Sequence, residues 1–545
     1  MRSRAHRTAD VSEALEPEAA TIGRRPRAAH AGSKWLTLAA MCFALFMIML
    51  DNTVVNVALP TIQRDLNASP SALEWTINSY VLTFAALILL GGKLGDRFGR
   101  RRMFLVGLAV FTIMSAACAL STTDQMLIAF RAMQGVGAAL MNPLSLSIIV
   151  AAFPRRQVST AIGVWAGISG LGMAIGPLVG GALVESISWS AVFWINVPIG
   201  LVAAVATLAF VAESREPGTH HLDVVGAGLV TAGLFALVFG LIETNSHSWT
   251  SLFTLSWLAA ATVLLALFVA WEARAREPML PLRFFRSRRF SVASVAVAFV
   301  GLGLFGVIYF LTLYFQNVKG YSALEAGLAT LPLTGMLMLV APMTGKLQQR
   351  FGNRALMSAG LLLAAGGLLG LTQLTVDTGY MEIWPFYIMM GGGIALALPS
   401  TSAMAMGAVE TERAGIASGV INASRQVGAA MGIAILGAVG ATLAGNAWAD
   451  GTAGLTGAAA ARADTLTGAV IGGQGAVVGQ AAGPAAEQVA LEAFVSGVRG
   501  AMWVAAGLLL AAALVGFFGL RGHREEPLLD RSVAAAPPER VPVEV

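Results

Sequence analysis

The chain has 545 residues, of which 56% are hydrophobic and only 12% are charged, and its mean hydropathy is +0.73. Soluble domains carry about 25% charged residues, so this composition excludes the soluble enzyme classes and indicates a membrane protein. The net charge of +5 comes from basic residues scattered between hydrophobic runs, a pattern of membrane topology that argues against nucleic-acid binding. The two cysteines lie inside apolar runs and predict neither a disulfide framework nor a metal site.

Hydrophobic runs of the length needed to cross a bilayer, about 20 residues, recur along the whole chain. They predict an all-α membrane protein with fourteen transmembrane helices, at 36–58, 75–92, 103–120, 125–149, 158–183, 190–212, 224–242, 253–271, 290–315, 326–345, 355–373, 382–405, 414–440 and 495–519. We expect a six-helix bundle at 35–212, two inserted helices with a linker at 213–289, a second six-helix bundle at 290–519 that carries an external loop at 441–492, and disordered cytoplasmic tails at 1–34 and 520–545.

The loops between these helices show a strong bias in their basic residues. If the amino terminus is cytoplasmic, cytoplasmic segments hold 29 of the 35 lysines and arginines, while the external loops hold three, Arg64, Lys319 and Arg462. Basic residues favour cytoplasmic loops, so the bias predicts that both termini are cytoplasmic.

A ten-residue segment occurs twice in the chain. Residues 92–101 read GKLGDRFGRR and residues 345–354 read GKLQQRFGNR, with seven identical positions at an offset of 253. The same offset brings the start of the first predicted helix next to the start of the ninth. We therefore expect two parallel copies of a six-helix unit, an architecture known among secondary transporters, with substrate bound near the midplane between the halves. The alternative is a chance match of two short basic loops.

Four stretches together resemble a known family. They are LDNTVVNVALP (50–60), GGKLGDRFGRRR (91–102), RAMQGVGAALMNP (131–143) and GLGMAIGPLVGGAL (170–183). The chain is similar to the major facilitator superfamily and, within it, to the fourteen-span drug:proton antiporters of the EmrB/QacA type. The second copy of the loop departs from the pattern, because Gln348 and Gln349 replace the Gly-Asp pair.

Asp51 is the one acid that we place well inside a predicted helix, and Arg131 is a buried base of the same half. At 1.5 Å per residue, Asp51 lies roughly 10 Å and Arg131 roughly 9 Å below the external ends of their helices. A lone buried charge is costly, so we expect the two to pair, directly or through Gln134, with Asn52 as further support. Alternatively, each charge faces its own polar or watery surroundings.

The carboxyl of Asp51 is a candidate proton carrier. Poor hydration favours its protonated form, and a nearby arginine favours its ionised form. A carboxyl on which these two effects nearly balance can bind and release a proton as its exposure to water changes. The same carboxyl could also attract a cationic substrate. Because Asp51 stands nearly alone, we expect neutral or monovalent cationic substrates. The alternative role is a fixed ion pair that only orders the helices.

Two further motifs predict parts of a transport cycle. The loop 92–101 permits a tight turn, and its acid can cap a helix or pair with a neighbouring arginine; the family resemblance implies a cytoplasmic gate formed by Gly92, Gly95, Asp96, Arg97, Gly99, Arg100 and Arg101. The fifth predicted helix contains small residues four apart and a proline, which favour close packing and a bend. We expect a seal between the halves from Gly172, Gly176, Pro177, Gly180 and Gly181. The alternatives are a loop that serves topology alone and ordinary helix packing.

Aromatic and polar side chains in three helices are candidates for the substrate cavity, since aromatic faces suit flat or cationic amphiphiles. The candidates are Trp75, Asn78, Tyr80, Phe305, Tyr309, Tyr314, Arg425 and Gln426. Each aromatic residue could equally face lipid, and Arg425 could be structural.

These features predict a proton-coupled multidrug efflux transporter of the cell membrane that exports hydrophobic or monovalent cationic compounds by alternating access. The chain contains no phosphate-binding loop, because Gly92-Lys93 and Gly345-Lys346 are each followed by leucine. We expect no enzymatic activity, no catalytic residue, no metal and no cofactor, with the proton gradient as the driving force. The expected partners are lipid, protons and small hydrophobic or cationic molecules, and the expected unit is a monomer. Export of one antibiotic or metabolite, proton-coupled uptake, and a non-transporting sensor or channel remain alternatives.

Overall fold

The computed structural model describes residues 33–519, with gaps at 216–222, 246, 276–277, 410–413 and 454–457. Nearly all of both predicted tails lies outside this range. Within it every regular element is a helix, and thirteen helical segments are long and apolar enough to cross a membrane. The predicted tenth and eleventh spans are merged in that number, because Ala323–Leu371 forms one segment with a break at Gly352, where the backbone has φ 77°. The all-α, multi-span fold class is confirmed.

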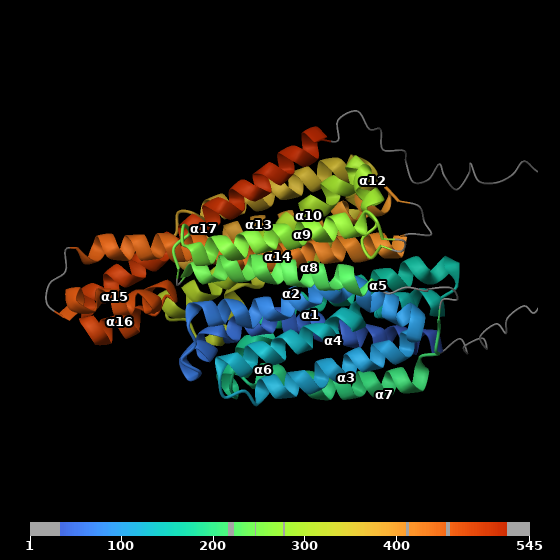
Figure 1. The fold of residues 1–545 in the computed structure, drawn as a ribbon, viewed down its shortest axis with the longest axis horizontal. Helices are drawn as coiled ribbons and strands as arrows, with labels where there is room; N and C mark the ends of the chain where they lie inside the picture. The colour runs from blue at the N-terminus through green and yellow to red at the C-terminus, as the bar shows by residue number, and fades with distance from the viewer. Residues whose placement is uncertain are drawn as a thin grey trace, which may run out of the picture.

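The helices form two bundles with a helical pair between them (Figure 1). The first bundle consists of α1 (Ser33–Asp65), α2 (Pro70–Phe98), α3 (Arg100–Ala119), α4 (Asp124–Ala152), α5 (Arg155–Ser186), α6 (Ala191–Trp194) and α7 (Asn196–Phe210). The inserted pair is α8 (Val224–Ile242) and α9 (Leu252–Glu272), joined through the short 3-10 helix η1 (Glu243–Asn245). The second bundle contains η2 (Leu282–Arg286), α10 (Arg288–Leu313), the π-helical turn η3 (Tyr314–Val318), α11 (Ala323–Ala329), α12 (Leu331–Leu371), α13 (Tyr380–Met406), α14 (Ala414–Thr452), α15 (Ala458–Ile471), α16 (Gly475–Ala482) and α17 (Pro484–Gly519).

The two bundles repeat the same packing pattern. In the first, α1 packs against α5 and α7, and α4 packs against α2 and α3. In the second, α10 packs against α14 and α17, and α13 packs against α12, which contains the equivalents of α2 and α3. The repeat in the sequence therefore corresponds to a repeat in tertiary packing. The inserted helix α8 contacts α2 and α14, at the seam where the two bundles meet.

The duplicated loop reaches the same backbone conformation in both copies. Gly99 has φ 110°, and Gly352, which lies 253 residues later, has φ 77°. Residues with a Cβ rarely adopt such positive φ values, so glycine is required at both turns. Both turns interrupt the helical backbone, after α2 in the first copy and within the α12 segment in the second.

The described part of segment 441–492, which was predicted to be an external loop, either flexible or an amphipathic lid, is largely helical. Helix α14 continues to Thr452, α17 begins at Pro484, and α15 and α16 pack between them. Trp448 is buried in this extension and donates a hydrogen bond of 2.9 Å from Nε1 to the Ala463 carbonyl. Figure 1 shows α15 and α16 projecting at one end of the molecule. The many alanines give this segment a high helix propensity, which outweighs its glycines.

The two bundles contact each other at the ends that we predict to be external. The side-chain amide of Gln316 in η3 donates a hydrogen bond of 2.8 Å to the Val57 carbonyl of α1. Glu185 of α5 accepts a hydrogen bond of 3.1 Å from the Leu324 backbone nitrogen of α11. These contacts close the predicted external side of the interface between the bundles.

Candidate functional site

Asp51 of α1 and Arg131 of α4 form an ion pair inside the first bundle. Arg131 Nη1 lies 2.6 Å from Asp51 Oδ2, and the two side chains are 0% and 1% exposed. The depth estimate from the sequence placed both at a similar level, and the structure brings them into direct contact. A pair this deep survives only with its remaining hydrogen-bonding groups occupied, because removing two ions from water is costly.

Two side-chain amides complete the coordination of Asp51. Gln134 Nε2 and Asn196 Nδ2 each donate a hydrogen bond of 3.0 Å to Asp51 Oδ1. Gln134 was predicted to support the pair. Asn52 was predicted to do so too, but its amide donates instead to the Ile48 carbonyl of its own helix, at 2.9 Å. Sequence reasoning missed Asn196, although an asparagine between apolar runs at the start of α7 is a visible signal.

Arg131 has further partners besides Asp51. Its Nη1 donates to Gln134 Oε1 at 2.7 Å, and its Nε donates to the Thr76 carbonyl at 3.2 Å. Its guanidinium carbon lies 4.2 Å from the centre of the Tyr80 ring, a cation–π distance. Tyr80 therefore belongs to the charge network in this conformation.

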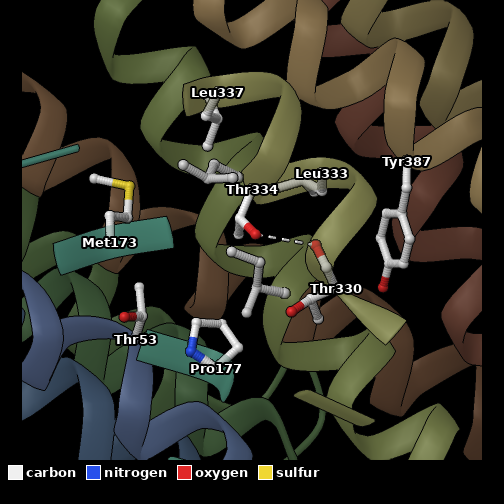
Figure 2. Close-up of a pocket in the computed structure, with 10 residues that line it drawn as sticks. Thr53, Met173, Pro177, Thr330, Leu333, Thr334, Leu337 and Tyr387 are labelled. Carbon is white, nitrogen blue, oxygen red and sulfur yellow. Dashed lines mark hydrogen bonds between the residues drawn. The ribbon is translucent and has the colours of Figure 1, made fainter. Parts of the chain in front are cut away.

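A small cavity of about 20 Å³ lies between the two bundles. Figure 2 shows Thr53, Met173 and Pro177 of the first bundle on one side, with Thr330, Leu333, Thr334, Leu337 and Tyr387 of the second bundle on the other. Leu304 and Ile308 of α10 complete the lining. The lining side chains are apolar or carry a hydroxyl, and none of them is charged. A cavity of this size holds about one water molecule, so it must widen to accept a drug-sized ligand.

None of the eight residues predicted to line a cavity lines this one. Trp75 packs against Phe235 and Phe239 of α8. Phe305, Tyr309 and Tyr314 are buried in the second bundle, and the Tyr314 hydroxyl donates to the Thr375 carbonyl at 2.8 Å. Leu304 and Ile308 face the cavity instead, because the rotation of α10 about its own axis places these residues toward the first bundle.

The three polar candidates are also placed elsewhere. Asn78 and Gln426 are buried outside the cavity lining. Arg425 Nη2 donates a hydrogen bond of 2.9 Å to Asn422 Oδ1, and Asn422 Nδ2 donates one of 2.8 Å to Asn142 Oδ1 of α4. Arg425 therefore takes part in a polar chain that joins α14 to the first bundle.

Glu74, one residue before the predicted second span, is a second buried acid in the observed helix α2, which corrects the expectation that Asp51 stands nearly alone. It lies in the first turns of α2 and is 2% exposed. A Cβ placed on Gly437 of α14 would lie 2.8 Å from Glu74 Oε2, so this carboxyl packs against the other bundle. The phenol of Tyr309 lies within electrostatic range of it. Glu74 adjoins the predicted helix limit, and for that reason the sequence alone did not mark it as buried.

The small residues of α5 serve two different contacts. Gly172, Gly176 and Gly180 pack against α1, so they tighten the first bundle and do not lie between the bundles as predicted. A Cβ on Gly181 would lie 2.5 Å from the Ala323 carbonyl oxygen of α11, and Gly327 of α11 packs against the Pro177 carbonyl. The contact between the bundles is thus made by the last part of the motif.

The predicted gate loop packs within the first bundle. Asp96 pairs with Arg100, four residues later, at 2.8 Å. Glu213, beyond the end of α7, accepts hydrogen bonds from the backbone nitrogens of Arg101 at 3.1 Å and Arg102 at 3.2 Å. Glu213 was not among the predicted residues, and it ties the start of α3 to the segment after α7.

The other predicted gate residues line the same turn. Gly95 packs against Leu144 of α4, and Gly92 lies near Pro143 of the same helix. Arg101 Nη2 donates a hydrogen bond of 2.7 Å to the Leu208 carbonyl. The exposed Arg97 lies over the Phe98 ring, with 5.2 Å between the guanidinium carbon and the ring centre. Each of these contacts joins two residues of the first bundle.

Residues 41–433 match the family model described as the Major Facilitator Superfamily. The chain belongs to this superfamily. Among its relatives in the superfamily is the tetracenomycin C resistance and export protein of Streptomyces glaucescens, which is 37% identical over 95% of this chain and 97% of its own length. Multidrug resistance protein Stp of Mycobacterium tuberculosis is 38% identical over 74% of this chain and 75% of its own length. The chain is thus a multi-pass membrane protein whose relatives include resistance and export proteins.

Solved structures of the superfamily agree with the fold. A bacterial homologue of the human lysosomal transporter Spinster, in an inward-facing and unoccupied conformation, is similar with a TM-score of 0.62 and 19% identity, over 91% of this chain and all of that one. A D-xylose–proton symporter is similar with a TM-score of 0.57 and 13% identity, over 89% of this chain and 97% of that one. At these identities the similarity supports the major facilitator fold and no particular substrate.

Proposed function

We propose that this superfamily member is a proton-coupled efflux transporter of the cell membrane, with both termini cytoplasmic, that exports hydrophobic or monovalent cationic compounds by alternating access. The observation that carries the proposal is the buried Asp51–Arg131 pair next to an uncharged cavity between two bundles. Export is supported by the relatives, which are resistance and export proteins. The proton gradient drives the monomer without a cofactor.

The surroundings of Arg131 suit a carboxyl that gains and loses a proton. When Asp51 is protonated, Arg131 still has the Gln134 amide oxygen, the Thr76 carbonyl and the Tyr80 ring as partners. Protonation of Asp51 therefore leaves the arginine without a counter-ion but not without partners, which reduces the cost of its buried charge. Protonation weakens the link between α1 and α4 without dismantling the site.

The link between proton and substrate runs through helix α1. Asp51 faces the interior of the first bundle, whereas Thr53, two residues later, lines the cavity. Residues two apart on a helix point about 200° apart, so one side chain cannot serve both sites. We therefore favour coupling through movement of α1, and not the direct competition of proton and drug for Asp51.

The cavity lining favours substrates with a large apolar part. Its surface comes from leucine, isoleucine, methionine and proline, with three threonines and Tyr387 as polar contacts. Binding sites of this type take hydrophobic ligands and orient them with a few hydrogen bonds. Glu74 lies apart from this lining, at the contact between α2 and α14.

Dye efflux from inverted membrane vesicles with an imposed pH gradient tests the proposal. We expect Asp51→Asn to reach the membrane in normal amounts and to lose proton-driven export. Asp65→Asn is the matched control, because it removes an exposed acid at the end of the same helix. Full proton-driven export by Asp51→Asn would remove Asp51 from the mechanism.

A second candidate is the export of one specific antibiotic, as supported by the relative that exports tetracenomycin C. The same vesicles distinguish the two candidates when a panel of unrelated dyes and aromatic antibiotics is tested. Transport of several chemical classes supports multidrug export, and transport of a single class supports the specific exporter.

A further inference from the structure

Three ionisable side chains meet at the predicted cytoplasmic end of the inserted pair, away from the Asp51 site. Asp223 caps the first turn of α8, Glu272 is the last residue of α9, and Lys93 belongs to α2. Asp223 is 8% exposed and Glu272 is 3% exposed. Two buried carboxyl groups at one point require a physical explanation, because each ionised carboxylate loses its hydration there.

The hydrogen bonds of this cluster leave one oxygen of each acid without a donor. Asp223 Oδ1 accepts from the Gly226 backbone nitrogen at 2.7 Å and from Trp271 Nε1 at 2.8 Å. Glu272 Oε2 accepts from the Leu280 backbone nitrogen at 3.1 Å. Asp223 Oδ2 and Glu272 Oε1 are buried and receive no hydrogen bond from the described residues.

The two remaining oxygens converge on the same place. A Cβ built on Gly226 would lie 2.5 Å from Asp223 Oδ2 and 2.9 Å from Glu272 Oε1. Two ionised carboxylates so arranged would repel each other in a poorly hydrated site. A single proton removes the repulsion, because a carboxylic acid donates one hydrogen bond and the neighbouring carboxylate accepts it.

The charge of Lys93 matches this arrangement. Lys93 and Asp223 are the ionisable groups of the described chain that act electrostatically on Glu272. Lys93 Nζ donates a hydrogen bond of 3.1 Å to the Pro278 carbonyl, in the segment just after α9. With one proton shared between the acids, the pair carries one negative charge against one positive charge, so the buried cluster is neutral.

We propose that Asp223 and Glu272 form a second proton-binding site, which holds one shared proton and clamps the inserted pair to α2 at Lys93. Binding of the proton joins the start of α8, the end of α9 and the 278–280 segment beside the predicted gate loop. Loss of the proton at high cytoplasmic pH leaves a net negative charge in the cluster and loosens the clamp.

The second copy of the duplicated loop supports a special role for Lys93. Lys346 occupies the equivalent position and is exposed on α12. The inserted pair packs on α2, and among the described residues no comparable contact joins α8 or α9 to α12. The repeat thus supplies an internal control, because the equivalent lysine, Lys346, lies on a helix without a comparable contact to the inserted pair in the described residues.

Infrared difference spectroscopy of the purified full-length protein, titrated with base from acidic to alkaline pH, detects the proton directly. Ordinary carboxyls lose their acid band at about pH 4, so the band of interest is the one lost above that range. There we expect the wild type and Asp51→Asn to lose a carboxylic-acid carbonyl band that corresponds to one group, while Glu272→Gln lacks this loss. Glu492→Gln, which changes an exposed acid of α17, should keep it. The proposal is overturned if the band change is the same in wild type and Glu272→Gln.

Thermal unfolding as a function of pH provides a second test. The unfolded chain releases this proton at about pH 4, whereas the native cluster keeps it, so the melting temperature of the wild type should fall as pH rises from acidic toward alkaline values. In Glu272→Gln the amide donates permanently to Asp223, so the variant should fold and lose this part of the pH dependence. Lys346→Met should leave the pH dependence of the melting temperature unchanged, and Lys93→Met should alter this pH dependence. An unchanged pH slope in Glu272→Gln would contradict the shared proton, and neither readout depends on drug transport.

Discussion

The side-chain amide of Asn196 lies 3.0 Å from Asp51 Oδ1 and 3.0 Å from Ser115 Oγ. Ser115 in turn donates a hydrogen bond of 2.9 Å to the Phe193 carbonyl. One asparagine at the start of α7 therefore links the ionisable group of α1 to α3. This arrangement makes α7, and not only α4, part of the hydrogen-bond network around Asp51.

Replacing Asn196 with leucine should weaken both the fold and proton coupling. The change removes a donor to a buried carboxylate, and such a loss costs about 1–3 kcal/mol. Thr207→Val is the matched control on the same helix, because Thr207 is buried and its hydroxyl has no hydrogen-bond partner among the described residues. Chemical unfolding in detergent should show a lower stability for Asn196→Leu and little change for Thr207→Val. Equal effects of the two variants would mean that the bond to Asp51 contributes nothing.

Neutralising Glu74 should favour the conformation in which the predicted external ends of the two bundles are closed against each other. In the closed arrangement its carboxyl is buried against Gly437 of α14, where an ionised carboxylate loses its hydration. The carboxylate regains this hydration when the external ends of the two bundles separate. Glu74→Gln reduces the free energy gained on opening, because a neutral amide is less strongly hydrated. Distances between spin labels at the external ends should shift toward the closed population, whereas Asp377→Asn, at an exposed external acid, should not shift them. A shift toward the open population would contradict the argument.

Replacing Gly181 with a larger residue should favour separation of the two bundles at their predicted external ends. A Cβ at this position meets the Ala323 carbonyl oxygen at 2.5 Å and the Leu324 Cα at 2.7 Å, so the two bundles must separate. Gly170→Ala is the control, because no atom of the described residues lies within 4 Å of the Cβ position on Gly170. Spin-label distances should increase in Gly181→Ala only. Transport should slow in that variant, since it destabilises one state of the cycle.

Gly99→Ala, in the first copy of the repeat, and Gly352→Ala, in the second copy, should each destabilise the protein. Their φ values of 110° and 77° are unfavourable for a residue with a Cβ, and the strain costs of order 1–3 kcal/mol. Gly99→Ala should cost more, because its Cβ would also lie 2.8 Å from the Glu213 carboxyl carbon. Gly228→Ala in α8, with open space at its Cβ position, should leave the melting temperature unchanged or raise it. Wild-type stability of both loop variants would show that these turns can relax.

The sequence by itself determined the membrane-spanning helices and their duplication, and it favoured a pairing of Asp51 with Arg131 over separate polar surroundings for the two charges. Hydropathy and basic loops are local properties, so they can be read one segment at a time. The repeat was visible because seven of ten positions match between residues 92–101 and 345–354, and the pairing was favoured because a lone buried charge is costly. The helical structure of 441–492 could not be decided from the sequence, because its many glycines and alanines give conflicting local signals.

Only the tertiary structure decided which face of each helix meets which neighbour. It brought Asn196 to Asp51, turned Leu304 and Ile308 toward the cavity in place of Phe305 and Tyr309, and buried Glu74 at the contact with α14. In a soluble protein the apolar face of a helix marks its buried side. Lipid is as apolar as the interior of the bundle, so in this protein the hydrophobic pattern does not mark that side, and the rotation of each helix is set by close packing and by a few polar contacts.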